Sequence, residues 1–122
     1  MSKKYFVTFG SKNFKWQRKH LANLVKNSGF YDEVVEMGPE DLSPDFKRKF
    51  SEIFKINRGY GFWIWKADVL NQLLSKIKFG DTITYSSAGS SFNPLGVDRL
   101  KYYFELLESS KSGNLRFQLT DH

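Results

Sequence analysis

Residues 85–96, YSSAGSSFNPLG, form a loop-like segment that could hold a ligand although it carries no charged side chain. The segment follows the apolar run of residues 82–84, so we expect a buried strand to lead directly into it. Loops at the carboxyl ends of strands are where α/β proteins bind ligands. Such a loop normally contains an Asp, Glu, His or Lys side chain, whereas this one offers only hydroxyl, amide and backbone groups. No catalytic base can be named among them.

A second candidate segment is TFGSKN, residues 8–13, which lies between a predicted strand and a predicted helix. A strand, a Gly-containing loop and a helix N-terminus together expose backbone N–H groups, an arrangement typical of an anion or nucleotide site. The pattern is neither G-x-G-x-x-G nor G-x-x-x-x-G-K-[ST], so the dinucleotide and P-loop interpretations fail. An ordinary turn between a strand and a helix is the alternative interpretation.

The third candidate segment is RGYGFWIWK, residues 58–66, which combines two glycines, four aromatic residues and two basic residues. The glycines on either side of Tyr60 permit a tight backbone. If a helix begins near residues 62–63, Lys66 lies in its first turn, where the helix dipole does not favour a cation, and a nearby phosphate would explain the charge. We expect a base or sugar ring to stack here, with Lys66 or Arg58 on a phosphate. The alternative is that the tryptophans are half-buried core residues and that Lys66 extends into water.

The elements that must position these segments alternate along the chain. Hydrophobic periodicity and Gly, Pro and Ser punctuation predict strands over residues 5–9, 33–37, 82–86 and 115–119, and helices that start near residues 11, 43, 62 and 97. This alternation indicates an α/β fold, with a small, mostly parallel sheet and helices on both faces. We expect residues 1–122 to form one domain. The last strand, close to the end of the chain, would be an exposed edge.

Composition narrows the classes of protein. The 122 residues are 40% hydrophobic and 17% aromatic, enough for one domain with a core. The chain has no Cys and only two His, which excludes disulfides and argues against a zinc site. It has neither a long apolar run nor a signal peptide, so we expect a soluble, cytoplasmic protein without a membrane span. A net charge of +6 favours nucleic acid, an anionic membrane or a phosphorylated small molecule as partner; a solvated basic surface is the alternative.

Three stretches resemble, in order, a family of small glycosyltransferases from bacterial surface-polysaccharide gene clusters and large phages. They are GYGFWIWK, then GDTITYSSAGSSFNPLG, then the helix that contains YYFELL. The family pattern reads G-Y-G-[YF]-W-x-W-K-P, then G-D-x-x-x-Y-x-D-A-G, often continuing S-x-N-P-x-G. Residues 7–10 and 16–19 are also similar to the first strand and helix of that family. The resemblance covers nearly the whole chain.

The resemblance implies a GT-A, Rossmann-like fold that binds a nucleotide-diphosphate sugar, with UDP the expected nucleotide and GDP the alternative. In the family an aspartate at the end of a strand holds Mn²⁺ or Mg²⁺ against the diphosphate. Here Ser87 stands in that position, and a neutral hydroxyl is a poor ligand for these cations. Three explanations fit: a degenerate binding module with a weakened or lost transfer activity, replacement of the metal by Lys66, Arg58 and backbone groups, or removal of the aspartate by engineering. Ala67 also departs from the pattern, and the acceptor-binding half of the relatives is missing.

The resemblance also carries over a set of residues expected to bind the nucleotide-sugar. They are Thr8, Phe9, Gly10, Arg18, Arg58, Tyr60, Trp65, Lys66, Ser86, Ser87, Gly89 and Asn93. Thr8, Phe9 and Gly10 would contact the nucleoside, and Arg18 would reach the base or a phosphate. Tyr60, Trp65 and Lys66 would surround the sugar and diphosphate. Ser86, Ser87 and Gly89 would lie beside the diphosphate, and Asn93 would touch the transferred sugar. Asp98 and Glu105 are expected on a solvated helix face.

The sequence therefore predicts a donor-binding domain that transfers a hexose to an unidentified sugar or glycan acceptor, or that slowly hydrolyses its donor. The alternative is a basic nucleic-acid-binding module without enzymatic activity. Its phosphate contacts would come from two groups of basic residues: Lys12, Lys15, Arg18 and Lys19, and Lys47, Arg48 and Lys49. An unpaired edge strand would also let subunits pair, so we expect a homo-oligomer rather than a simple monomer.

Overall fold

The computed structural model describes residues 2–56, 64–88 and 92–114, and the chain divides into two compact units, residues 1–92 and 93–122. The first unit holds a sheet of three strands, β1 (Lys4–Phe9), β2 (Glu33–Met37) and β3 (Thr82–Ser87). The strands are parallel in the order β2-β1-β3. The predicted α/β class with a parallel sheet is confirmed. The strand predicted over residues 115–119 lies outside the described residues, and a single domain stays a prediction.

The first helical segment begins later than the sequence predicts. A short 3₁₀ turn, η1 (Lys12–Phe14), precedes helix α1 (Lys15–Ser28), and the side chain of Ser11 caps neither. The helix ends at Gly29, whose φ of 69° lies in the left-handed region that favours glycine and whose N–H donates to the carbonyl oxygen of Lys26.

The helix predicted after Ser43 is interrupted. It forms two short pieces, α2 (Pro44–Lys49) and α3 (Ser51–Phe54), because Phe50 leaves the helical region with φ −114° and ψ 27°. The ring of Phe46 packs against the rings of Phe50 and Phe54, at centroid distances of 4.8 and 5.9 Å, so the aromatic face is kept across the break. A 3₁₀ turn, η2 (Pro39–Asp41), joins β2 to this region, and helix α5 (Trp65–Leu74) follows.

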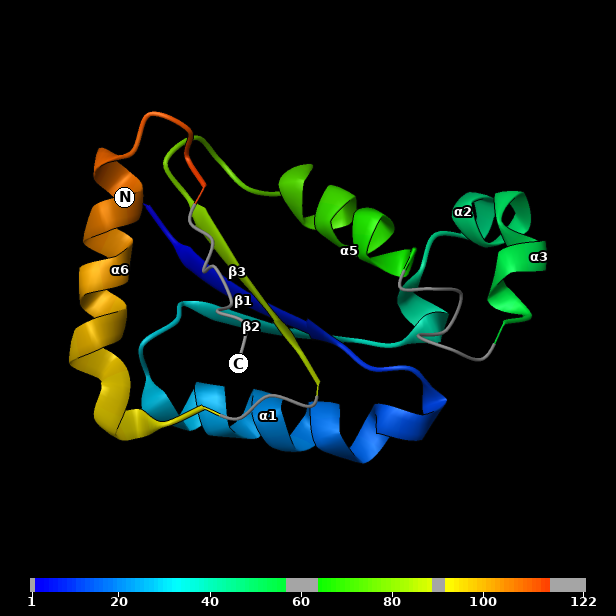
Figure 1. The fold of residues 1–122 in the computed structure, drawn as a ribbon, viewed down its shortest axis with the longest axis horizontal. Coiled ribbons are helices and arrows are strands. Elements are labelled where there is room, and N and C mark those ends of the chain that lie inside the picture. Colours follow the sequence, from blue (N-terminus) through cyan, green and yellow to red (C-terminus); the bar gives the residue numbers. More distant parts are fainter. Residues whose placement is uncertain (1, 57–63, 89–91, 115–122) are drawn as a thin grey trace, which may run out of the picture. The chain divides into compact units, whose positions relative to one another are not determined.

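The two long helices of this unit cover opposite faces of the sheet (Figure 1). Because side chains alternate along a strand, Val7 and Phe9 of β1 face α5, whereas Phe6 faces α1. The α5 side is the larger core and is completed by Trp65, Val69 and Leu73. On the other side Leu21 and Val25 of α1 pack on Phe6. This is the two-sided arrangement that the alternating pattern predicts.

The second unit contains the 3₁₀ turn η3 (Pro94–Gly96) and helix α6 (Val97–Ser109). The side chain of Asn93 accepts a hydrogen bond from the N–H of Leu95 at 3.0 Å, so it caps the turn. Phe104 is the buried residue of α6. The helix predicted from residue 97 is confirmed. Among the described helices of either unit, none is long and apolar enough to cross a membrane.

Candidate functional site

The order of the strands defines where a ligand site would lie. β2 is added on one side of β1 and β3 on the other, so the strand order reverses at β1. In open α/β sheets, ligands bind at the carboxyl ends of the strands next to such a reversal. The register pairs Thr8 with Ser86 and Phe9 with Ser87, so the loops that follow β1 and β3 start side by side. Two of the three segments singled out in the sequence therefore meet at one edge of the sheet.

The third segment contributes the start of α5 to the same edge. The rings of Phe9 and Trp65 stack with their centroids 4.0 Å apart and their planes 18° from parallel, and the Tyr85 ring lies 6.2 Å from Trp65. Phe9 is 2% exposed and Trp65 5%, so these rings cover one another and leave no open face for a base or sugar. They form an aromatic floor on the α5 side. The proposed stacking of a ligand on Trp65 stays a prediction.

Lys66 is an exposed cation at the start of α5. Its Nζ atom lies 4.8 Å from the centroid of the Tyr85 ring, a cation–π contact. Within the part of the chain that the structure describes, Lys66 forms no ion pair, so its charge can serve an added anion. Burial raises the pKa of Tyr85 to about 12, so this phenol is neutral near pH 7 and offers the ammonium group a ring rather than a charge.

Arg18 is committed to the protein itself. Its Nη1 atom donates to the carbonyl oxygens of Gly10 at 2.7 Å and Met37 at 3.3 Å. Its Nε atom pairs with Glu36 at 2.9 Å and its Nη2 atom with Glu40 at 3.3 Å. The side chain is buried on the α1 side of the sheet and joins the loop after β1 to the loop after β2. We therefore assign it to positioning these loops, and its contact with a ligand stays a prediction.

Two glycines make room for this arginine. A Cβ atom at Gly38 would lie 1.9 Å from the Nη1 atom of Arg18. One at Gly10 would lie 2.9 Å from the carbonyl oxygen of Phe14 and 3.1 Å from the Cβ and Cδ atoms of Arg18. The arginine also affects Glu40: a backbone hydrogen bond at Glu40 itself lowers the pKa of its carboxyl group, and the charges of Arg18 and Lys15 lower it further. The Phe14 carbonyl oxygen and the Arg18 side chain together therefore explain the glycine of the first loop without any ligand.

The remaining predicted residues are placed as follows. Thr8 is fully buried on the α1 side, and its hydroxyl has no hydrogen-bond partner among the described residues. Ser86 is half-buried, whereas Ser87 is exposed. Asn93 belongs to the second unit, residues 93–122. The other three predictions, Arg58, Tyr60 and Gly89, lie outside the described residues.

The groups at this edge do not fit a divalent metal ion. The chain has no Asp or Glu between Asp81 and Asp98, so β3 and its loop supply only neutral oxygens, next to the Lys66 ammonium. Mn²⁺ and Mg²⁺ prefer carboxylate oxygens. In residues 2–56, 64–88 and 92–114, no group of three or more His, Cys, Asp or Glu side chains could hold a metal. The arrangement instead suits an anion that is held by an ammonium group and hydroxyls.

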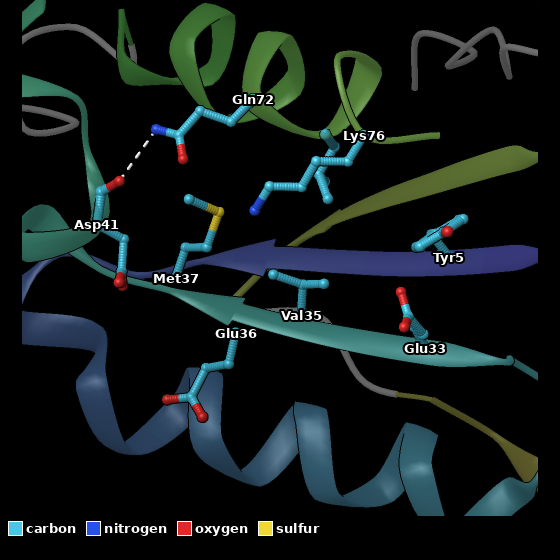
Figure 2. A pocket seen from close by; sticks show the side chains of 9 residues that line it. Tyr5, Glu33, Val35, Glu36, Met37, Asp41, Gln72 and Lys76 are labelled. Atoms are coloured by element: carbon cyan, nitrogen blue, oxygen red, sulfur yellow. Dashed lines mark hydrogen bonds between the residues drawn. The ribbon is translucent and has the colours of Figure 1, made fainter. Parts of the chain in front are cut away.

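A pocket that the sequence did not predict lies between β2 and α5 on the same side of the sheet as the aromatic floor. It has a volume of about 300 Å³, and Figure 2 shows Lys76, from the turn after α5, reaching into it while Glu36 points to the opposite face. Gln72 closes one end by donating to the carbonyl oxygen of Asp41 at 3.0 Å. The pocket is lined by Tyr5, Glu33, Val35, Glu36, Met37, Asp41, Gln72, Leu73 and Lys76.

Asp68 is a second positioning residue that the sequence reading missed. It is 7% exposed, and its carboxylate accepts hydrogen bonds from the N–H and hydroxyl of Ser43 at 2.9 and 3.0 Å and from Gln72 at 2.9 Å. These bonds fasten the first turn of α5, and with it Lys66, to the chain before α2. The signal was present in the sequence, because Asp68 lies three residues after Trp65 on the stripe that also holds Val69.

Comparisons with models of protein families, with curated proteins and with solved structures found no match. The glycosyltransferase resemblance therefore stays a prediction from the sequence.

Proposed function

We propose that this chain is the donor-binding domain of a small glycosyltransferase and binds a nucleoside diphosphate sugar, with UDP the expected nucleotide, at the carboxyl ends of β1 and β3. The observation that carries the proposal is the register of these strands. It brings Phe9 beside Ser87, and α5 adds Lys66 to the same edge. Residues nearly 80 positions apart in the sequence thus form one polar site above a buried aromatic floor.

Each group has a role in this proposal. Lys66 binds the diphosphate as the main cation, because its ammonium group is exposed, contacts the Tyr85 ring and forms no ion pair within the described residues. The Ser87 hydroxyl hydrogen-bonds a phosphate oxygen from the end of β3. The Phe9–Trp65 stack keeps the floor rigid and dry, which strengthens the electrostatic attraction above it. Arg18 and Asp68 hold the loops and the first turn of α5 in place.

Because the Lys66 ammonium group and the Ser87 hydroxyl bind the diphosphate, binding does not depend on a divalent metal. Ser87 replaces the carboxylate that the resemblance leads one to expect, and Lys66 neutralises the diphosphate instead. Transfer then depends on groups beyond those at the ends of β1 and β3, where no described side chain can act as a general base. Without an acceptor, water would attack the anomeric carbon as its bond to the diphosphate breaks, which releases free nucleotide slowly.

Calorimetric titration with UDP, UDP-sugars and GDP tests this proposal. The wild-type chain should bind UDP equally well with Mn²⁺ and with a chelator. Lys66→Gln should weaken binding at least about tenfold, since a charge-assisted hydrogen bond contributes about 1.5–3 kcal/mol. Lys76→Gln is the matched control, because Lys76 follows the carboxyl end of α5 and lines the pocket beside β2. Failure of all three ligands to bind, or equal losses in the two variants, would contradict the proposal.

A further inference from the structure

The amino-terminal part of the chain carries an uninterrupted positive charge. The first 31 residues contain six lysines and one arginine but no Asp or Glu. Arg18 is buried and bonded, whereas Lys12, Lys15, Lys19 and Lys26 are exposed on η1 and α1. Glu36 and Glu40 are paired with Arg18, and the charge of Lys15 also acts on Glu40. Within the described residues, none of these four lysines forms an ion pair.

Large aromatic side chains accompany these lysines. Trp16 is 72% exposed and Phe14 47% exposed. The inner side of α1 is already filled by Leu21, Val25 and the rest of its buried stripe, so Trp16 is not part of the core. His20, one turn further along, stacks on Trp16 with ring centroids 5.2 Å apart and planes 6° from parallel. The outer face of α1 thus presents a Trp–His pair beside a row of lysines.

We propose that this outer face, defined by Lys12, Phe14, Lys15, Trp16, Lys19 and His20, binds the surface of an anionic phospholipid membrane. Lysines on a helix are drawn to anionic headgroups by the surface potential. Tryptophan rings settle at the boundary between headgroups and acyl chains, where one part of the ring is apolar and the N–H finds a partner. A helix that lies along the membrane with a Trp and flanking lysines combines both contributions.

The same residues fit nucleic acid less well. Arginine is the side chain that makes paired hydrogen bonds to phosphates and bases, and the single arginine of this stretch is buried. Bases stack on open aromatic faces, whereas one face of the Trp16 ring is already covered by His20. Lysines, as compact point charges, are sufficient for a diffuse anionic surface. Charge complementarity and the exposed Trp16 together favour a membrane.

Vesicle co-sedimentation of the full chain tests the inference. Vesicles of phosphatidylcholine and phosphatidylglycerol in equal amounts should bind the protein, pure phosphatidylcholine vesicles should not, and added salt should release it. Because each lysine at such a surface strengthens binding about fivefold, Lys15→Gln combined with Lys19→Gln should weaken partitioning about thirtyfold. Trp16→Ala should also weaken it. The control is Lys76→Gln combined with Lys78→Gln, which removes the same charge on the α5 side.

The inference would be overturned if the protein did not bind the anionic vesicles at physiological salt, or if the α1 and control variants lost binding equally. It would also be overturned if the protein bound single- or double-stranded nucleic acid tightly through α1 and did not bind the vesicles. That result would assign the surface to nucleic acid. The variants leave Lys66 and Ser87 unchanged, so loss of vesicle binding with UDP binding intact separates this surface from the nucleotide site.

Discussion

The Nη1 atom of Arg18 donates a hydrogen bond of 2.7 Å to the carbonyl oxygen of Gly10, eight residues earlier in the chain. The bond joins α1 to the end of β1, and the same guanidinium reaches Met37 and Glu36 at the end of β2. The loops that border the proposed site are therefore held together by one buried cation. Arg18, which the sequence suggested as a ligand contact, holds these loops together from the α1 side of the sheet.

Replacing this arginine should destabilise the fold. Arg18→Met leaves Glu36 and the carbonyl oxygen of Gly10 without the guanidinium donor, whereas the carbonyl oxygen of Met37 keeps the N–H of Gly10. Breaking a buried pair on one side costs about 3–5 kcal/mol. Arg18→Lys should recover part of the loss, because an ammonium group cannot reach all four acceptors. The free energy of unfolding in urea measures both. Arg48→Met, which breaks the exposed Arg48–Asp45 pair, is the control, with a loss below about 1 kcal/mol. Equal losses in the two methionine variants would show that Arg18 does not hold the loops after β1 and β2 together.

Gly38 should tolerate no side chain while Arg18 is in place. A Cβ atom there would lie 1.9 Å from the guanidinium, so Gly38→Ala must displace it and should cost about 1–3 kcal/mol. In an Arg18→Met background most of this penalty should vanish, which a double-mutant cycle detects. Gly96→Ala is the matched control, since Gly96 has φ −92° and nothing within 4 Å of its added Cβ. Additive penalties at Gly38 and Arg18 would contradict the packing described.

A carboxylate at position 87 should make nucleotide binding depend on a divalent metal. Without metal, Ser87→Asp adds a negative charge beside the diphosphate and should bind UDP more weakly than the wild type. With Mn²⁺ it should bind more tightly, because a carboxylate at the end of β3 supplies the ligand that the hydroxyl does not. Ser75→Asp, at the far end of α5 from Lys66, should show neither effect. If titrations of Ser87→Asp are indifferent to Mn²⁺, the end of β3 does not face the diphosphate.

Tyr85 should make stability fall in strong alkali. Burial raises its pKa in the folded chain to about 12, above the value of 10.0 for an unburied tyrosine. Between these two values the folded state holds the proton that the unfolded state has lost, so the free energy of unfolding decreases as pH rises. Burial also raises the pKa of Tyr31, which adds to the decrease. Tyr85→Phe should flatten the slope measured by denaturant unfolding across this range; an unchanged slope would place Tyr85 in water.

The strands and helices could be predicted from the sequence, because hydrophobic periodicity indicates which residues are buried. The strands around Val7, Val35 and Ile83 either alternate or are continuously apolar, as a parallel sheet requires. Gly29, a residue type that readily adopts a left-handed φ, ends α1. The break at Phe50 could not be predicted, because Phe46, Phe50 and Phe54 keep helical spacing while the backbone departs from it. Periodicity reports which face is apolar and not whether the hydrogen-bond ladder continues.

The site was harder to predict because its cations look alike in sequence. Arg18 occupies the buried stripe of α1, three residues before Leu21 and seven before Val25, and this spacing was the signal that it points inward. Lys66 interrupts no such stripe and is exposed. A buried charge on an apolar stripe requires partners, and these came from β2 and η2, elements whose proximity to α1 only the fold reveals.

Backbone amide shifts on addition of UDP, recorded by NMR on the uniformly labelled chain, test the central claim most directly. We expect the largest changes on Gly10, Lys66 and Ser87, where the ends of β1 and β3 meet the start of α5, and we expect them without added metal. Changes centred on Glu33, Gln72 and Lys76 would place the nucleotide in the pocket beside β2, and an unchanged spectrum at saturating UDP would remove the nucleotide site altogether.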